Sequence, residues 1–289
     1  MSAKWNTSVI VTTYNSSDRL RLCLAAIEMQ SVLPDEIVIA DDGSTEEHVR
    51  VVEEIVERSS LKIVHAWQED AGPRRSANRN NGVRHATGDY LLFVDGDAVL
   101  LPECVAVHLA ESTPRHWLTG DGVWLTEDES SRATEEVIRS GRLDELWPGP
   151  DDPRCRNLRA RARRFRMRAF MQWLWWSERQ YRKLHARTIH FSVSRAALEK
   201  VNGFDEAFEG HGNEDADLGL RLQIAGFRGR TVADRARALH LYHEQAESGS
   251  SNADYHDRPR HGEFRCQRGL VSCGRPQHAG GCPDQRDSS

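Results

Sequence analysis

Two aspartates interrupt an apolar segment of this sequence. Residues 91–101 read LLFVDGDAVLL, in which only Asp95 and Asp97 carry charge. Burying an unpaired carboxylate is energetically costly, so these side chains must reach solvent, pair with a cation or hold a ligand. Two carboxylates one residue apart at the end of a strand can bind Mg²⁺ or Mn²⁺, with water and phosphate oxygens in the remaining positions. The pair therefore indicates a candidate divalent-metal site.

A second group of acids lies in the sequence GFDEAFEGHGNEDADLGLRLQIAGF, residues 203–227. Glu214, Asp215 and Asp217 fall in the first turn of a predicted helix, where the helix dipole favours negative charge. The dipole alone does not account for the loop rich in Gly, His and Asn that precedes them and supplies several backbone N–H groups. A carboxylate held beside apolar aromatic residues such as Phe204 is suited to act as a general base.

An alternation of strand and helix patterns must position these acids. The first hundred residues contain apolar runs of strand length at 8–12, 36–40, 62–66 and 90–94. Alternation at this spacing is typical of βαβ units and of a largely parallel sheet that is covered on both faces. Ligands of such sheets bind beyond the carboxyl ends of the strands. Polar clusters fall at these ends, and we expect them to converge on one edge: Thr13-Tyr14-Asn15, Asp41-Asp42 and Asp95-Gly96-Asp97.

The second half of the chain is less regular. A turn-rich segment at 147–153 precedes an arginine cluster and then a helical pattern that contains several tryptophans. Helices are predicted at 195–201 and 213–225, and strands at 189–193, 231–233 and 238–242. From about residue 246 the sequence is rich in Gly, Pro, Ser and balanced charge, which predicts a poorly ordered tail.

Two features of this half have alternative interpretations. From Arg154 to Arg168, eight of fifteen residues are Arg and none is acidic. This cluster indicates either a solvated or disordered surface arm, or a dock for anionic lipid headgroups, a lipid diphosphate or a phosphate-rich acceptor. The tryptophan-rich helix that follows is either packed on the core or forms a wall for the acceptor or a membrane surface.

The composition limits the class of protein. The chain has 289 residues, of which 38% are hydrophobic, with a net charge of −5 and a mean hydropathy of −0.64. These values are typical of a soluble protein of one large or two small domains, and they indicate no binding of nucleic acid. The apolar runs are too short to span a bilayer and the N-terminal residues lack a signal pattern. We therefore expect a cytoplasmic protein, in peripheral contact with the inner face of the membrane if the arginine cluster binds lipid.

The cysteines fit a cytoplasmic location, because Cys23, Cys104 and Cys155 are scattered singly and form no disulfide framework. The tail also holds the ligand types of a Cys₃His zinc site, in a spacing that matches no common zinc motif: Cys266, Cys273, His278 and Cys282.

Four motifs in this order resemble the inverting family 2 glycosyltransferases of GT-A fold. They are VIVTTYNSSDRL (Val9–Leu20), IVIADDGST (Ile37–Thr45), ANRNNGVRHATGDYLLFVDGD (Ala77–Asp97) and FDEAFEGHGNEDADLGLRLQIAG (Phe204–Gly226). The last motif is similar to the galactosyltransferase-type carboxyl-terminal motif G-W-G-x-E-D, with His211 in place of Trp. The resemblance covers residues 7 to about 243. It implies a Rossmann-like α/β fold with a mostly parallel central sheet flanked by helices.

The resemblance also implies a domain organisation and a donor site. Residues 1–110 would form the nucleotide-sugar-binding half, residues 111–245 a smaller acceptor-binding half, and residues 246–289 the tail. The residues that would bind the base and ribose of the donor are Thr12, Tyr14 and one of Asp41 and Asp42. Arg79 would brace the diphosphate side of the donor.

Metal binding and catalysis are assigned by the same resemblance. Asp95 would reach the ribose or the metal, and Asp97 would bind the Mn²⁺ or Mg²⁺ ion that bridges the diphosphate. A histidine after the last core strand would complete the metal shell, and of His240 and His243 we favour His240. Asp215 would be the general base, with Glu214 holding the acceptor or orienting the site. Further residues are expected to contact the acceptor: His211, Asn213, Trp173 and Trp176.

These observations favour a metal-dependent enzyme that moves a sugar from a nucleotide-diphosphate sugar, expected to be a UDP-sugar, to an acceptor hydroxyl with inversion. The acceptor would be a saccharide, a lipid-linked molecule, or a peptide or other natural product. Two alternatives stay open. DGDAVL also resembles the first motif of haloacid-dehalogenase-type phosphatases, in which Asp95 would be the nucleophile, although three βα units precede it here. The second alternative is a non-catalytic nucleotide-sugar-binding protein.

Overall fold

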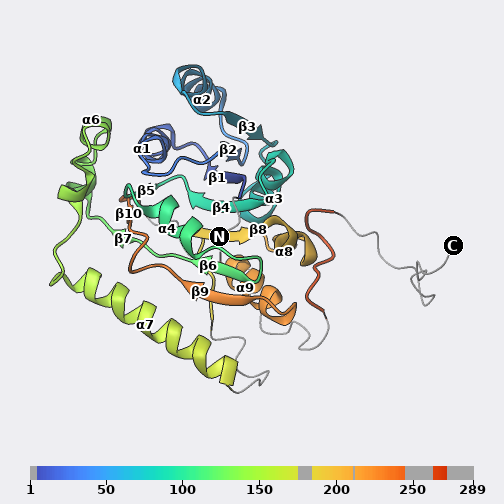
Figure 1. Ribbon diagram of the computed structural model, residues 1–289. Helices are drawn as coiled ribbons and strands as arrows, with labels where there is room; N and C mark the ends of the chain where they lie inside the picture. Colours follow the sequence, from blue (N-terminus) through green and yellow to red (C-terminus); the bar gives the residue numbers. More distant parts are fainter. Residues whose placement is uncertain (1–4, 175–183, 211, 245–262, 272–289) are drawn as a thin grey trace.

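The strand and helix pattern of the first hundred residues folds as the sequence predicts (Figure 1). The computed structural model describes residues 5–174, 184–210, 212–244 and 263–271, with the backbone alone for 173 and 174. The elements of the first part are β1 (Thr7–Thr13), α1 (Ser17–Glu28), β2 (Glu36–Asp41), α2 (Glu46–Arg58), β3 (Ile63–Trp67), α3 (Arg75–His85) and β4 (Tyr90–Asp95).

The second part of the chain mixes short strands with helices of varied length. Its elements are β5 (Ala98–Leu100), α4 (Cys104–Glu111), β6 (His116–Thr119), β7 (Val123–Trp124), α5 (Glu127–Ser131), α6 (Glu135–Arg139), the 3₁₀ helix η1 (Leu143–Leu146), α7 (Pro153–Leu174), β8 (His190–Ser194), α8 (Arg195–Lys200), α9 (Glu214–Ile224), β9 (Arg228–Thr231) and β10 (Ala238–His240). The strand expected at 231–233 lies earlier, at 228–231, and the last strand ends at 240.

A seven-stranded sheet forms the centre of the molecule, in the order β3-β2-β1-β4-β8-β6-β9. Strand β8 is antiparallel to both of its neighbours, and the remaining pairs are parallel. A smaller sheet has the order β5-β10-β7. The mostly parallel α/β fold predicted from the sequence is therefore confirmed. The second half of the chain adds β8, β6 and β9 to the sheet of the first half, and the domain boundary at residue 110 stays a prediction.

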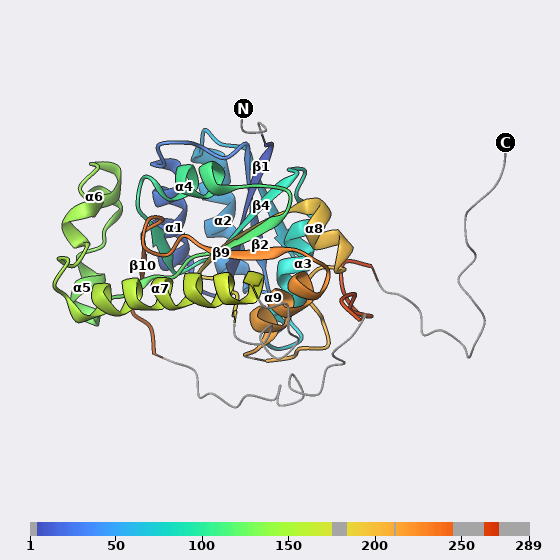
Figure 2. The same ribbon diagram turned by 60° about the horizontal axis from the view of Figure 1, so that its bottom comes forward.

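Helices cover both faces of the large sheet (Figure 2). Alternate residues of a strand point to opposite faces. Val9 and Val11 of β1 therefore pack with α1, α2 and α4 on one face, whereas Ile10 packs with α3, α8 and α9 on the other. These two apolar layers fix the register of the strands. They also fix which residues end each strand at the carboxyl edge.

Helix α7 includes the arginine cluster, whereas the sequence analysis expected a helical pattern only beyond it. The helix begins at Pro153, and proline is favoured at the first helical position because its missing N–H has no partner there. Ion pairs tie three of the arginines to the body of the protein: Arg154 to Glu129 and Asp152, Arg161 to Asp121, and Arg166 to Asp234. The cluster is a surface helix and not a disordered arm.

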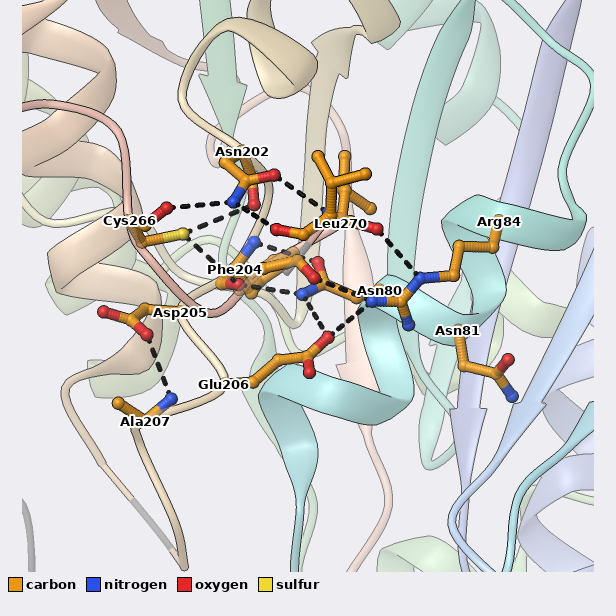
Figure 3. A network of polar contacts seen from close by, with 12 residues as sticks. Asn80, Asn81, Arg84, Asn202, Phe204, Asp205, Glu206, Ala207, Cys266 and Leu270 are labelled. Carbon is orange, nitrogen blue, oxygen red and sulfur yellow. Dashed lines mark hydrogen bonds and ion pairs between the residues drawn. The ribbon is translucent and has the colours of Figure 1, made fainter. Parts of the chain in front are cut away.

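Part of the tail packs on the fold, which corrects the expectation that it is poorly ordered from residue 246. In the described segment 263–271, Cys266 is 3% exposed and its thiol donates to the carbonyl of Asn202 at 3.3 Å. The Asn202 side chain donates to the carbonyls of Cys266 and Val271, as Figure 3 shows for the network around it. The other expected zinc ligands, at 273, 278 and 282, lie outside the described residues.

None of the helices formed by the described residues combines the length and the apolar character that crossing a bilayer requires.

Candidate active site

The polar clusters at the ends of β1, β2 and β4 meet at one edge of the sheet, as the sequence predicts. Thr12 lies beside Asp95 in the β1–β4 ladder, and Thr13 lies beside Asp41 in the β1–β2 ladder. Steric crowding explains why a glycine, Gly96, lies between Asp95 and Asp97. A Cβ on Gly96 would lie 2.4 Å from the carbonyl oxygen of Thr12, to which the Gly96 N–H donates. The motif therefore turns tightly against β1. Asp95 lies beside Arg79, whereas Asp97 lies beside His240 and His243.

A buried arginine connects the two acidic motifs. Arg79 of α3 is 2% exposed, and its guanidinium contacts Asp95 at 3.1 Å and Glu214 at 3.2 Å. It also donates to the hydroxyl of Thr188 at 2.8 Å, and it lies over the ring of Phe204 with 5.4 Å from Cζ to the centroid. The sequence analysis expected Arg79 to brace the diphosphate. Its burial favours a different role, which is to hold the carboxylates of β4 and α9 together.

The Glu-Asp pair stands at the first turn of α9. Asn213 precedes the helix in the left-handed conformation with φ 70°, a region that Asn tolerates better than most residues. Glu214 accepts the backbone N–H of Gly212 at 3.1 Å as well as the Arg79 contact. Burial raises the pKa of Glu214, but the Arg79 guanidinium outweighs it and holds the pKa below its usual range. Glu214 is therefore an ionised, immobilised side chain.

Asp215 is the titratable member of the pair. Its Oδ1 accepts the N–H of Ala216 at 2.7 Å. Burial and the negative charge of Glu214 raise the pKa of Asp215 to about 6, against an opposing effect of Arg79. A carboxylate with a pKa in this range accepts a proton readily near neutral pH, whereas an ordinary aspartate is too weak a base.

A second cluster gathers around Asp97. The Nε2 of His240 lies 3.4 Å from Asp97 Oδ1, and the Nε2 of His243 lies 3.4 Å from Asp97 Oδ2. The backbone holds this arrangement, because the N–H of Leu241 donates to the carbonyl of Asp97 and β10 pairs with β5. The sequence analysis favoured His240 over His243, and the structure brings both side chains to the same carboxylate.

The proton positions in this cluster suit a cation. The Nδ1 of His240 lies 3.0 Å from the carbonyl of Leu241, and that of His243 lies 2.9 Å from the carbonyl of Glu244. A carbonyl can only accept, so each Nδ1 carries a proton and Nε2 is the ring nitrogen that could bind a metal ion. Both Nε2 atoms face the Asp97 carboxylate, whose buried Oδ1 has no hydrogen-bond partner in the described part of the chain. The three side chains fit a divalent metal ion.

Trp124 is a neighbour of this cluster that the sequence analysis did not select. Its ring stacks on the imidazole of His240, with 3.6 Å between centroids and 15° between planes, and it is 42% exposed. The pairing of β7 with β10 brings the two residues side by side. No local pattern marks Trp124, because its partner lies more than a hundred residues further along the chain.

The acids expected to contact the nucleotide are engaged within the protein. Both oxygens of Asp41, which is 0% exposed, accept hydrogen bonds, from the Ser44 N–H at 2.9 Å and the His65 ring at 3.0 Å. Burial raises the pKa of Asp41, but these hydrogen bonds outweigh it and the pKa lies below its usual range. Asp42 likewise accepts from the side chain of Gln68 and the N–H of Arg74.

Side chains in β3 and just after it also belong to this edge. The 51%-exposed Tyr14 donates its hydroxyl to Asp70 at 3.1 Å. His65, Gln68 and Asp70 were not selected from the sequence, although the rule that selected Asp41 and Asp95 applies equally to the end of the third strand. Asp41 and Asp42 therefore stabilise the segments that follow β2 and β3. The exposed Tyr14 is better placed to contact a ligand.

The acceptor side is described in part. Asn213 lies at the start of α9, next to Glu214. His211 and Trp176 lie outside the described residues, and so does the side chain of Trp173 in the last turn of α7. Thr188 is a residue of this region that the sequence analysis missed. Its hydroxyl contacts Arg79 from the segment that leads into β8.

Two family models match this chain. The family model "Glycosyl transferase family 2" matches residues 8–115. The model "N-terminal domain of galactosyltransferase" matches residues 177–244, which include the Glu-Asp pair and both histidines. The first half of the chain is therefore similar to glycosyl transferases of family 2, and the second half is similar to a galactosyltransferase domain.

Two relatives are similar to this chain over most of its length. Validoxylamine A glucosyltransferase from Streptomyces hygroscopicus subsp. limoneus is 30% identical over 253 residues, which are 84% of this chain and 53% of that protein. Chondroitin synthase from Pasteurella multocida is 29% identical over 241 residues, which are 81% of this chain and 24% of that protein. The chain thus spans about half of the first relative and a quarter of the second.

Solved structures support the GT-A fold. The mannosyltransferase PcManGT from Pyrobaculum calidifontis, in complex with GDP-Man and Mn²⁺, superposes with a TM-score of 0.53 at 18% identity. The match covers 86% of this chain and 59% of that one. S. aureus TarS 1–349 superposes with a TM-score of 0.50 at 20% identity, covering 82% and 60%.

Proposed function

We propose that this protein transfers a sugar from a nucleotide-diphosphate sugar to an acceptor hydroxyl, with inversion at the anomeric carbon and with Asp215 as the general base. The observation that carries the proposal is the position of Asp215. Its carboxyl group has a pKa of about 6 and is next to Glu214, which Arg79 connects to Asp95 on the donor edge. The two family-model matches and the proteins named above support the reaction class.

The residues around Asp97 would hold the metal. Asp97, His240 and His243 offer one carboxylate and two imidazoles, a donor set that suits Mn²⁺ better than Mg²⁺, which prefers oxygen ligands. When bound, the ion would supply positive charge that stabilises the departing nucleoside diphosphate. The chain's own residues supply the rest of the chemistry.

Asp215 would accept the acceptor's hydroxyl proton as the oxygen attacks the anomeric carbon. Because Oδ1 already accepts the Ala216 N–H, Oδ2 is the oxygen that takes the proton. Glu214 stays ionised and keeps the pKa of its neighbour high, while Arg79 keeps both motifs at a fixed separation. A single displacement requires no protein nucleophile.

The phosphatase alternative would use Asp95 as the nucleophile, whereas in this assignment Asp95 anchors Arg79. Oδ1 of Asp95 is held by Arg79 at 3.1 Å and approached by the Thr12 hydroxyl at 3.5 Å. We propose a UDP-sugar as the first donor to examine, and a saccharide, a lipid-linked molecule and a natural product as acceptor classes. The cytoplasmic location expected from the sequence stays a prediction.

The experiment that tests the proposal compares two aspartate variants. Asp215→Asn should abolish transfer while it retains Mn²⁺ and nucleotide binding, measured by calorimetry. Asp97→Asn should lose Mn²⁺ binding together with transfer. Transfer at the wild-type rate in Asp215→Asn would exclude this residue as the base.

A further inference from the structure

One face of α7 presents arginines followed by apolar side chains. Arg156, Arg159, Arg163, Met167 and Phe170 recur at intervals of three or four residues, which places them on one stripe of the helix. All five are exposed, and Met167 and Phe170 are 60% and 57% exposed. At 1.5 Å per residue the stripe is about 21 Å long.

The charge of this stripe is not neutralised by the protein. Three arginines on other faces of α7 are ion-paired: Arg154 with Glu129 and Asp152, Arg161 with Asp121, and Arg166 with Asp234. In contrast, Arg156, Arg159 and Arg163 have no acidic partner among the residues that the structure describes. Helix α7 itself contains no acid.

The face of the helix about 100° around its axis from this stripe belongs to the core. Cys155, Leu158 and Ala162 are 2% exposed and pack against the cluster that contains β5, β7 and β10. These contacts attach the first half of α7, and Phe165 and Ala169 pack the second half against the cluster that contains α8 and α9. Met167 and Phe170 keep more than half of their surface exposed beside the arginines, and exposed apolar side chains on a charged face can mark a binding surface.

We propose that this stripe of α7 binds the surface of an anionic membrane, with the three arginines on the lipid headgroups and Met167 and Phe170 entering the interface. Cationic residues attract an anionic leaflet, and exposed apolar residues on the same helix face add affinity by leaving water. A soluble polyanion would be held by the arginines alone and would gain nothing from the apolar end. The composition of the stripe thus favours lipid.

This surface is connected to the candidate metal cluster. The guanidinium of Arg154, in the first turn of α7, donates to the backbone carbonyl of Trp124 at 3.1 Å, and the Trp124 ring stacks on His240. Figure 2 shows α7 crossing the molecule close to β10 at one end and α9 at the other. A membrane bound along this helix would lie beside the sugar-transfer site.

Co-sedimentation with vesicles tests the proposal. The full chain is mixed with phosphatidylcholine vesicles that contain or lack phosphatidylserine, at low and high salt. Each arginine near an anionic surface strengthens binding by about five-fold, so changing Arg156, Arg159 and Arg163 to Gln should weaken binding to anionic vesicles by about a hundred-fold. High salt should also weaken binding of the wild type to anionic vesicles, because salt screens the attraction between charges.

Two further proteins complete the design. Met167→Ser with Phe170→Ser keeps all the charge and should also lose binding. A matched control removes three exposed arginines elsewhere, at Arg50, Arg58 and Arg115, and should bind as the wild type does. Equal nucleotide binding in all variants, measured by calorimetry, shows that each remains folded.

Equal binding of the wild type to neutral and anionic vesicles would overturn the proposal, as would unchanged binding of the triple arginine variant. It would also be overturned if the Met167 and Phe170 variant bound normally and soluble polyphosphate bound as tightly as vesicles. That result would identify the stripe as a polyanion site.

Discussion

The pH dependence of transfer follows from the environment of Asp215. The general base must be ionised, and burial together with Glu214 raises the pKa of Asp215 to about 6 from the usual 3.8. About a tenth of the enzyme would then be active at pH 5 and about nine-tenths at pH 7. With an ordinary aspartate pKa, nearly all of it would be active at both. We therefore expect kcat to rise about ten-fold from pH 5 to pH 7 and to level off above.

The contribution of Glu214 to the raised pKa of Asp215 can be separated from the contribution of burial. Glu214→Gln removes the negative charge beside Asp215, so the pKa of Asp215 falls and the acid limb of the profile moves to lower pH. The ratio of kcat at pH 5 to kcat at pH 7 should therefore increase in this variant, even if the plateau is lower. The measurement is the initial rate of nucleoside diphosphate release at saturating donor and acceptor.

Loss of metal is the competing explanation for a fall in rate at low pH, because imidazole ligands must be unprotonated to bind a metal. A ten-fold increase in Mn²⁺ at pH 5 discriminates between the two. It restores the rate if metal loss is the cause, and it leaves the rate unchanged if Asp215 is protonated. A kcat that is flat between pH 5 and pH 7, or an acid limb that Glu214→Gln does not move, would refute the role given to this pair.

Three further substitutions test the structural reasoning. Arg79→Met leaves the carboxylates of Asp95 and Glu214 without their buried partner, so urea unfolding should show a loss of about 3–5 kcal/mol; Arg50→Met, at a pair whose arginine side chain is 73% exposed, should lose at most about 1 kcal/mol. Trp124→Ala frees the His240 ring and should weaken Mn²⁺ binding about ten-fold by electron paramagnetic resonance, whereas Trp124→Phe should keep most of it. Gly269→Ala would place a Cβ 1.9 Å from the Asn202 carbonyl oxygen and should destabilise the fold by about 1–3 kcal/mol in urea, unlike Gly149→Ala, where a Cβ meets nothing within 4 Å. Unchanged unfolding of Arg79→Met or Gly269→Ala, or unchanged Mn²⁺ binding of Trp124→Ala, would contradict the contact concerned.

Local patterns predicted the donor half of the fold. Apolar runs of strand length, separated by helical periodicity, require βαβ units, and parallel strands end at a common edge. The convergence of the polar clusters around Asp41 and Asp95 followed from this rule. The first-turn position of Glu214 and Asp215 could also be recognised, because a helix start has a local signature.

The second half was harder to predict because its contacts are long-range. Strand β8 inserts between β4 and β6 in the antiparallel direction, and no alternation in the sequence marks this. Segment 263–271 has the composition of a tail, yet it is held by Asn202, whose side chain caps its backbone from 64 residues away. Such contacts depend on the folded positions of both partners.

By itself, the sequence determined the candidate site residues, since carboxylates and imidazoles at the ends of strands and helices are few and their order follows the chain. The tertiary structure decided which partners each of these residues contacts and how its pKa is shifted. A contact between Arg79 and Glu214, 135 residues apart, immobilises one acid of the Glu-Asp pair, and the burial of that pair raises the pKa of the other. The pairing of β10 with β5 and β7 brings both histidines to Asp97 and Trp124 onto His240. Burial and pairing are properties of packed surfaces, and packing depends on the whole chain.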